Sequence, residues 1–382
     1  MLLCRAVRGR RRSLPAPWPA SCRTRGRAAT GARRRDRPHT CARRARRGGC
    51  SRSLLALARS RLGGAVTDPV QLTRKIREAL TPCSLGRWPT PLEPAPALAT
   101  SLGLAALWLK REDRSAEPGG GVKVRGLEFL LADAPSDTIF VTIGGTGSTH
   151  CLATAVHARA LGRRSALAQF PQPETAATRD VAAAAAGAAD VVVRAQSLLT
   201  FPLALLDAWT AARRRGRPRW IPGGGAHPRA VAGHCLAGLE LATQLDAPPD
   251  AIVLPLGSGG TAAGLLLAVR TLGWSTTVVA VRVAPLVVAN GWRIRSLERS
   301  AAALLRPLGV SLRPAPSAFR IVNGMGRGYG HPTAAGESAR QLAAAHGVAL
   351  DPTYGAKAFA AVAPLAARGF RRIVFWHTFA VP

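Results

Sequence analysis

From Asp68 onward, short apolar runs alternate with Ala-rich stretches that have helical spacing. Runs with the composition of buried strands occupy residues 138–143, 190–193, 251–256, 276–283 and 372–376. Helical stretches, such as 175–188 and 231–245, separate them. Strands that alternate with helices of roughly 10–15 residues predict crossover units and a parallel sheet. The pattern therefore predicts an α/β fold.

Residues 1–64 have a different composition. They contain 19 Arg, no Lys and one acid, a net charge of +18 out of +33 for the chain. They have neither helical nor strand periodicity, and Arg runs such as 33–35 repel each other, so we expect a disordered extension. This composition fits a nucleic-acid tail, an organellar targeting peptide or upstream sequence translated from an early start. The apolar segment of roughly 7–15 residues that a secretory signal requires is missing.

Composition excludes several classes of protein. Apolar residues make up 47% of the chain, enough for one large or two moderate lobes, which excludes a wholly disordered chain. No window of about 18 apolar residues lacks both charge and proline, so we expect no membrane span. The seven cysteines have neither zinc-ligand spacing nor a disulfide framework. We therefore expect no metal site and a reducing, cytoplasmic location.

Lysine is rare enough in this chain to be informative. The 53 basic residues include only four lysines, Lys75, Lys110, Lys123 and Lys357. Arg stays protonated, so it cannot form a Schiff base, whereas Lys can. Lys123 follows the glycines of Gly119–Gly121 at the predicted start of a helix, where the helix dipole is expected to lower the pKa of its amine. We expect Lys110 and Lys357 to be structural.

Three further segments carry potential chemistry. Gly257, Ser258, Gly259, Gly260 and Thr261 follow an apolar run and open a helix, an arrangement that binds phosphate through backbone N–H groups and the helix dipole. Gly144–His150 repeats the order of strand, glycine turn and helix, with hydroxyls that suit a carboxylate. The third segment, 350–357, presents Tyr354 before a helix.

The glycine turn at 257–261 also matches a dinucleotide pattern, because Gly257, Gly259 and Ala262 have the spacing G-x-G-x-x-A. That pattern requires an acid about 20 residues further on, at the end of the next strand. Here Arg282 lies at that strand end, and the next acid is Glu298. An NADP-dependent oxidoreductase, with Arg282 on the 2′-phosphate, is therefore the weaker enzyme hypothesis.

Together these segments resemble one family, the fold type II pyridoxal-phosphate enzymes of the 1-aminocyclopropane-1-carboxylate deaminase and D-cysteine desulfhydrase group. Residues 120–129 read G-G-V-K-V-R-G-L-E-F, similar to the family's G-G-N-K-x-R-K-L-E-F. Residues 257–261 match its G-S-G-G-T, and both tyrosines of the chain, Tyr329 and Tyr354, fall on family tyrosines. The opening segments 88–92 and 109–113 are also similar, so the resemblance extends from about residue 85 to 378.

The resemblance implies two open parallel-sheet lobes with helices on both faces, a larger cofactor-binding lobe over 65–120 and 236–382 and a smaller one over 121–235. It implies that pyridoxal 5′-phosphate binds Lys123 covalently and that 257–261 hold its phosphate. The other implied site residues are Ser148, Thr149 and His150 for the substrate carboxylate, Thr149 and Thr378 for the cofactor ring, and Lys123, Ser148, Tyr329 and Tyr354 for catalysis.

Several positions depart from the family pattern. Thr149 stands where the family has an Asn that bonds the cofactor ring oxygen, and Val122 replaces the Asn before the lysine. Gly355 replaces the Glu of the deaminase or the Thr of the desulfhydrase, which the resemblance places beside the pyridine nitrogen. The terminal H-T-G-G is His377-Thr378-Phe379-Ala380 here, so Thr378 is the remaining hydroxyl for that nitrogen.

The resulting hypothesis is a lyase or deaminase that acts on a small amino acid, by D-cysteine-like β-elimination to a keto acid and ammonia. Gly355 counts against the cyclopropane-opening reaction, which needs its Glu. A divergent cofactor-binding protein with lost or altered activity remains an alternative, and so does a basic nucleic-acid binder, which has little support besides charge. We expect a homodimer with no specific nucleic-acid partner and no membrane partner.

Overall fold

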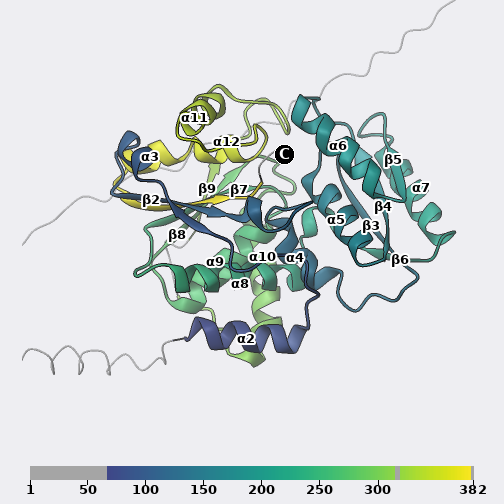
Figure 1. Cartoon of the computed structure of the whole chain (residues 1–382), viewed down its shortest axis with the longest axis horizontal. Helices are drawn as coiled ribbons and strands as arrows, with labels where there is room; N and C mark the ends of the chain where they lie inside the picture. The colour runs from purple at the N-terminus through teal and green to yellow at the C-terminus, as the bar shows by residue number, and fades with distance from the viewer. Residues whose placement is uncertain (1–66, 315–318, 380–382) are drawn as a thin grey trace, which may run out of the picture. The chain divides into compact units, whose positions relative to one another are not determined.

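Two parallel sheets organise the chain (Figure 1). The computed structural model describes residues 67–314 and 319–379. The predicted N-terminal extension, residues 1–64, and Ala380 lie outside this part of the chain. No helix of the described residues is long and apolar enough to cross a membrane.

The smaller sheet has four strands in the order β5-β4-β3-β6, and all of them are parallel. Its strands are β3 (Thr138–Gly145), β4 (Arg164–Phe170), β5 (Val191–Arg194) and β6 (Arg217–Trp220). The connecting helices are α5 (Thr149–Ala160), α6 (Ala176–Ala188) and α7 (Phe201–Arg213). Each strand is thus followed by a helix, as parallel pairing requires.

The larger sheet has six strands in the order β1-β2-β10-β7-β8-β9, of which only β1 pairs in the antiparallel sense. Its strands are β1 (Leu92–Pro94), β2 (Ala106–Arg111), β7 (Ala251–Leu256), β8 (Thr277–Arg282), β9 (Phe319–Asn323) and β10 (Arg372–His377). Short 3₁₀ turns occupy η1 (Glu112–Arg114), η2 (Gly223–Gly225) and η3 (Arg306–Leu308).

Helices cover both faces of the larger sheet (Figure 1). One face is covered by α8 (Pro228–Gln244) and α9 (Gly260–Leu272); α2 (Pro69–Leu80) packs against α8, and α10 (Gly291–Leu305) packs against both. The other packs against α3 (Pro96–Ser101), α11 (Ala334–Ala345), α12 (Gly355–Phe359) and α13 (Val362–Ala367). The short helix α4 (Lys123–Leu130) packs against α8. The predicted fold class, parallel sheets with helices on both faces, is confirmed. The lobe boundaries remain a prediction.

Two details differ from the sequence-based expectation. No strand is predicted from the sequence at residues 217–220, but Arg217 and Arg219 lie in β6, which pairs with β3 at the sheet edge. Arg217 forms an ion pair with Asp137 at 2.9 Å. The Pro in this strand is tolerated because an edge strand does not need every N–H for pairing. The run at 190–193 was expected to be buried, whereas β5 is a half-buried edge strand.

Candidate active site

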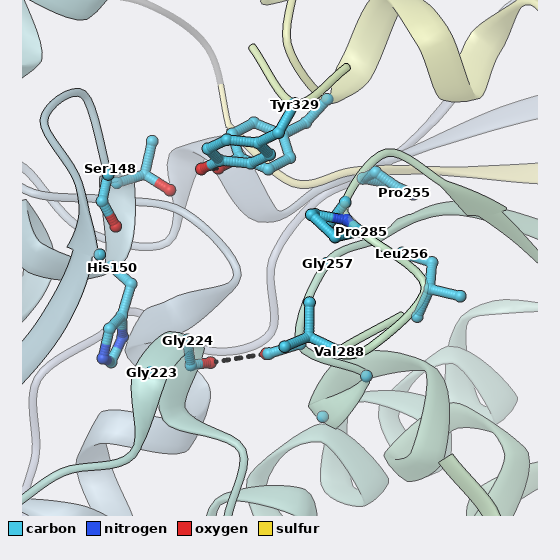
Figure 2. Close-up of a pocket in the computed structure, with 18 of the residues that line it drawn as sticks. Ser148, His150, Gly223, Gly224, Pro255, Leu256, Gly257, Pro285, Val288 and Tyr329 are labelled. Carbon is cyan, nitrogen blue, oxygen red and sulfur yellow. Dashed lines mark hydrogen bonds between the residues drawn. The ribbon is translucent and has the colours of Figure 1, made fainter. Parts of the chain in front are cut away.

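A cavity of about 750 Å³ lies at the carboxyl ends of strands from both sheets. Ile143–Gly145 of β3, Phe170 of β4 and Leu256 of β7 line it, and parallel α/β folds bind ligands at these strand ends. Figure 2 shows Ser148, His150 and Gly224 on one side of the opening and Leu256, Gly257 and Val288 on the other. The residues that the family resemblance assigns to the cofactor, the substrate and catalysis all line this one cavity: Lys123, Ser148, Thr149, His150, Gly257, Ser258, Gly259, Gly260, Thr261, Tyr329, Tyr354 and Thr378.

The glycine turn between β7 and α9 leaves a helix N-terminus open to the cavity. Gly259 is the N-cap of α9 with φ 92°, and no side chain caps this helix. A Cβ at Gly257 would meet nothing within 4 Å. The first backbone N–H groups of a helix have no intrahelical partner, so the turn presents donors and the positive end of the dipole to a ligand. This geometry fits a phosphate group.

Lys123 begins α4 and lines the same cavity. Its Nζ donates a hydrogen bond to the Gly224 carbonyl oxygen at 3.1 Å. Burial lowers the pKa of the Lys123 amine to about 8. The sequence predicted the direction of this shift, but its cause is burial rather than the helix dipole.

The loop at Gly223–Gly225 is a part of the site that sequence reasoning missed. The Gly224 carbonyl accepts hydrogen bonds from Lys123 Nζ and, at 3.2 Å, from Ser258 Oγ. It therefore joins the lysine to the glycine turn at 257–261. The available signal was a run of three glycines directly after an apolar residue and a proline. Such a run permits a tight loop, and Gly224 and Gly225 indeed have positive φ.

Arg293 is the second missed residue. It lies in the first turn of α10, lines the cavity, and donates from Nε to the Ser258 carbonyl oxygen at 3.1 Å. The C=O and the following N–H of a trans peptide point in opposite directions. By holding the Ser258 carbonyl, Arg293 fixes the direction of the Gly259 N–H. In a chain with so many arginines, nothing in the local sequence distinguishes this one.

The turn between β3 and α5 is built differently. Ser148 is the N-cap of α5, and its Oγ accepts a hydrogen bond from the Cys151 N–H at 3.3 Å. The Ser148 hydroxyl keeps its own proton to donate. Ser148 is nevertheless a cavity residue, so a carboxylate in the cavity can receive hydrogen bonds from this hydroxyl and from nearby N–H groups.

His150 is a neutral imidazole with a defined tautomer. Thr142 donates its only hydroxyl proton to the Ile221 carbonyl at 2.9 Å, so it accepts from His150 Nε2, also at 2.9 Å. His150 Nδ1 is then an acceptor, and it is buried without a partner. Burial and, second, the Lys123 charge lower the pKa of His150 to about 3. His150 therefore offers no positive charge to a substrate carboxylate.

The two tyrosines form a pair whose hydroxyl oxygens are 2.5 Å apart. Burial raises the pKa of both phenols, so both are protonated at neutral pH. One hydroxyl donates within the pair, which leaves the other proton for a ligand. The Asp351 carboxylate accepts a hydrogen bond from the Tyr354 N–H at 2.7 Å and so positions Tyr354. Lys357 Nζ donates a hydrogen bond to the Met325 carbonyl, which lies in the loop before Tyr329.

The C-terminal strand brings Thr378 to the cavity, where the Thr378 carbonyl accepts the Val122 N–H at 2.8 Å beside Lys123. Gly355, in contrast, is not among the described residues that line the cavity. Its N–H donates to Asp351 Oδ2, and a Cβ at this position would meet that oxygen at 2.9 Å. A larger residue at 355 would disturb Asp351, so a hydroxyl cannot simply be restored there.

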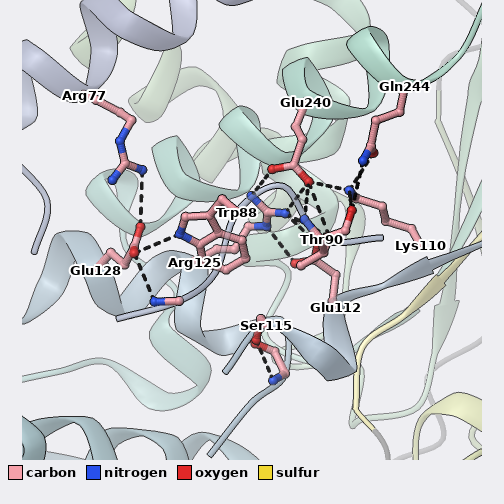
Figure 3. A network of polar contacts seen from close by, with 12 residues as sticks. Arg77, Trp88, Thr90, Lys110, Glu112, Ser115, Arg125, Glu128, Glu240 and Gln244 are labelled. Carbon is pink, nitrogen blue, oxygen red and sulfur yellow. Dashed lines mark hydrogen bonds and ion pairs between the residues drawn. The ribbon is translucent and has the colours of Figure 1, made fainter. Parts of the chain in front are cut away.

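A buried ionic network holds the helix that carries Lys123 (Figure 3). Arg125 forms ion pairs with Glu112 at 2.7 Å and with Glu240 at 2.8 Å, and its guanidinium lies 3.9 Å from the Trp88 ring centroid. Lys110 binds Glu240 as well. Lys110 therefore has a structural partner, and the network links α4 to β2 and α8.

Comparison with known proteins gives consistent relatives. The family model "Pyridoxal-phosphate dependent enzyme" matches residues 83–378. The nocardicin C-9′ epimerase of Nocardia uniformis subsp. tsuyamanensis is 36% identical over 299 residues, 76% of this chain and 90% of that protein. The D-cysteine desulfhydrase of Salmonella choleraesuis (strain SC-B67) is 33% identical over 283 residues, 71% of this chain and 84% of the relative.

A solved structure is similar over the same region. The crystal structure of an ACC deaminase homologue matches with a TM-score of 0.69 and 29% identity, covering 80% of this chain and 94% of that one. The family resemblance inferred from the sequence is thus confirmed, and with it the cofactor. The chain belongs to the family of pyridoxal-phosphate dependent enzymes.

Proposed function

We propose that the protein is a β-eliminating lyase that releases a sulfur leaving group from an amino acid, with D-cysteine as the simplest substrate. Three features that line one cavity carry this proposal. They are a lysine whose lowered pKa allows a neutral amine, a helix N-terminus without a side-chain cap, and a pair of protonated tyrosines. The 33% identity to a D-cysteine desulfhydrase supports it.

The cavity residues fit pyridoxal phosphate. The open N-terminus of α9, with empty space at Gly257, suits the 5′-phosphate, and Arg293 adds a positive charge there. Thr149 and Thr378 supply hydroxyls for the ring. When bound, the cofactor supplies an electron sink that stabilises negative charge at the α-carbon of an amino acid.

Lys123 binds the cofactor aldehyde. An amine with a pKa of about 8 is neutral in about one molecule in ten at pH 7, far more often than an exposed lysine, and only the neutral amine is nucleophilic. The Gly224 carbonyl orients Lys123 Nζ between the two glycine turns. The Lys123 amine would also serve as the base for the α-proton of a bound substrate, since it lies in the same cavity.

The other residues position the substrate and move protons. Ser148 and the N-terminus of α5 hold the carboxylate. The tyrosine pair donates a proton to the sulfur as the C–S bond breaks and the thiolate leaves with the bonding electrons. With one water, cysteine gives pyruvate, ammonia and hydrogen sulfide.

The first test is Lys123→Ala. The wild-type protein with pyridoxal phosphate should have a visible absorption band and release pyruvate from cysteine. Lys123→Ala should lose the band and at least about a thousandfold in rate, because no other described lysine lines the cavity. The matched control is Lys75→Ala, whose side chain is exposed on α2. Borohydride trapping of the cofactor on Lys110 or Lys357 would refute the assignment.

A second candidate is epimerisation at the α-carbon, favoured by the 36% identity to an epimerase. It uses the same proton removal by Lys123, with the proton returned from another donor such as the Tyr354 hydroxyl. Amino acids without a leaving group, incubated in D₂O, separate the two reactions. Loss of optical rotation with deuterium incorporation at the α-carbon identifies an epimerase, whereas an enzyme that only eliminates leaves the optical rotation of these substrates unchanged. The homodimer and the cytoplasmic location remain predictions.

A further inference from the structure

The charges lining the cavity are confined to the cofactor end. Among the described residues that line it, the charged side chains are Lys123 and Arg293, and no carboxylate is present. Lys123 binds the Gly224 carbonyl and Arg293 the Ser258 carbonyl, so both lie at the glycine turns. The rest of the cavity has no charged group to recognise a charged substrate side chain.

Beyond the tyrosine pair, the wall is apolar. Phe170, at the carboxyl end of β4, lies 6.2 Å from the Tyr329 ring centroid and packs edge-on against Phe201 at 5.5 Å. Pro171 and Pro173 continue this wall. Because the tyrosines would protonate the leaving group, the apolar wall beside Tyr329 is where the rest of that leaving group must lie.

The rim of the cavity is also apolar, although it faces water. Leu198 is 69% exposed and Val287 is 80% exposed, and both line the cavity. Leu198 follows β5 of the smaller sheet, and Val287 follows β8 of the larger sheet. Leu198 follows a strand of the same sheet as Phe170, so it extends the apolar wall beside Tyr329 toward the solvent.

We propose that this region, defined by Phe170, Pro171 and Leu198, is a subsite for a bulky apolar leaving group, so that the substrate is a cysteine thioether with an alkyl or aryl substituent. The cavity volume, about 750 Å³, includes the space for the cofactor, and it is in the upper part of the range of about 300–1,000 Å³ typical of sites for drug-sized ligands. This inference rests on the proposed function. The C–S bond to the cysteine β-carbon breaks, the thiolate leaves with both electrons and is protonated, and one water completes pyruvate and ammonia.

The test compares S-methylcysteine with S-benzylcysteine, each in D and L forms, on the holoenzyme. For the accepted enantiomer, kcat/KM for pyruvate release should be at least about tenfold higher with S-benzylcysteine, because each buried hydrocarbon unit adds transition-state binding. Leu198→Ser should lower this ratio about three- to tenfold. Leu206→Ser is the matched control, since Leu206 is 56% exposed on α7 outside the cavity lining, and it should leave the ratio unchanged.

A ratio of one or less, or equal effects of Leu198→Ser and Leu206→Ser, would overturn the subsite. If neither thioether is cleaved, their dissociation constants are measured from the change in the cofactor absorption spectrum. S-benzylcysteine must then bind at least about tenfold more tightly than S-methylcysteine. Failure of the proposed function looks different: the wild-type protein has no visible band with pyridoxal phosphate, or Lys123→Ala keeps it. If the protein has the visible absorption band and turns over cysteine, but kcat/KM is the same for both thioethers, the subsite is refuted and the proposed function stands.

Discussion

The two glycine turns of the cavity have the same order of strand, glycines and helix, yet they differ in which backbone N–H groups they leave free. At Gly144–Thr149, the Ser148 side chain caps α5 and occupies one of its free N–H groups. At Gly257–Thr261, α9 begins at Gly259 without any side-chain cap. The second turn thus keeps its donors for an anion with several oxygens, whereas the first offers mainly one hydroxyl.

The glycines themselves have different roles in the two turns. A Cβ at Gly144 would lie 2.5 Å from Ser148 Oγ and 2.7 Å from Cys151 Sγ, so this glycine is needed for packing. A Cβ at Gly257 would meet nothing within 4 Å, so this glycine leaves room for a ligand. The comparison teaches that the strand–glycine–helix order is not enough to propose a phosphate site. The uncapped helix and the empty space beside the glycine distinguish the turn at 257–261 from the other one.

Gly257→Asp should have the largest effect. A Cβ at this position meets nothing within 4 Å, and the new carboxylate would stand where we propose that the phosphate binds. Like charges about 4 Å apart repel by several kcal/mol at a partly buried site. We expect pyridoxal-phosphate affinity to fall at least about 100-fold. Gly257→Asn has the same shape without the charge and should lose much less. Equal affinities of the two variants, measured by absorbance titration, would place the phosphate elsewhere.

Gly144→Ala should lower the stability of the fold rather than the affinity for the cofactor. The added methyl group forces Ser148 and Cys151 apart, and overpacking of this kind costs about 1–3 kcal/mol of unfolding free energy. Cofactor affinity should change little, because the turn at 257–261 is untouched. Urea unfolding of the apoprotein and cofactor titration measure the two effects separately. Lost affinity with normal stability would mean that the first turn, and not the turn at 257–261, binds the cofactor phosphate.

The sequence was sufficient for the parts of this site that are local in the chain. A pattern of a few neighbouring residues is enough to predict each glycine turn, the lysine at the start of a helix and the tyrosine before α12. Arg293, Gly224 and Phe170 reach the cavity only through tertiary contacts, such as the hydrogen bond from Arg293 to Ser258. The edge strand β6 was missed for the same reason, because its pairing with β3 outweighs a composition of Arg and Pro.

Arg293→Gln should have an intermediate effect on the turn at 257–261. It removes a positive charge near the phosphate and the hydrogen bond that orients the Gly259 N–H. We expect about tenfold weaker binding of pyridoxal phosphate, or about 1.4 kcal/mol. Pyridoxal lacks the phosphate, and its affinity should not change. Arg295→Gln, on the same helix but outside the cavity lining, is the control. Equal losses for both ligands would mean that Arg293 only supports the fold.

Thr378→Val should have the smallest effect, because it concerns neither turn but the ring that would lie between them. The Thr378 carbonyl is tied to Val122, so its backbone position beside Lys123 does not depend on the side chain. Valine keeps the volume and removes the only hydroxyl expected to reach the pyridine nitrogen, since Gly355 does not line the cavity. One lost hydrogen bond should weaken cofactor binding by about 1 kcal/mol. Turnover should fall further, because the ring is a poorer electron sink without that partner. Thr378→Ser keeps the hydroxyl and should retain both properties. If valine changes neither affinity nor turnover, the nitrogen has no partner at this position, and the site depends on the two glycine turns and Lys123 alone.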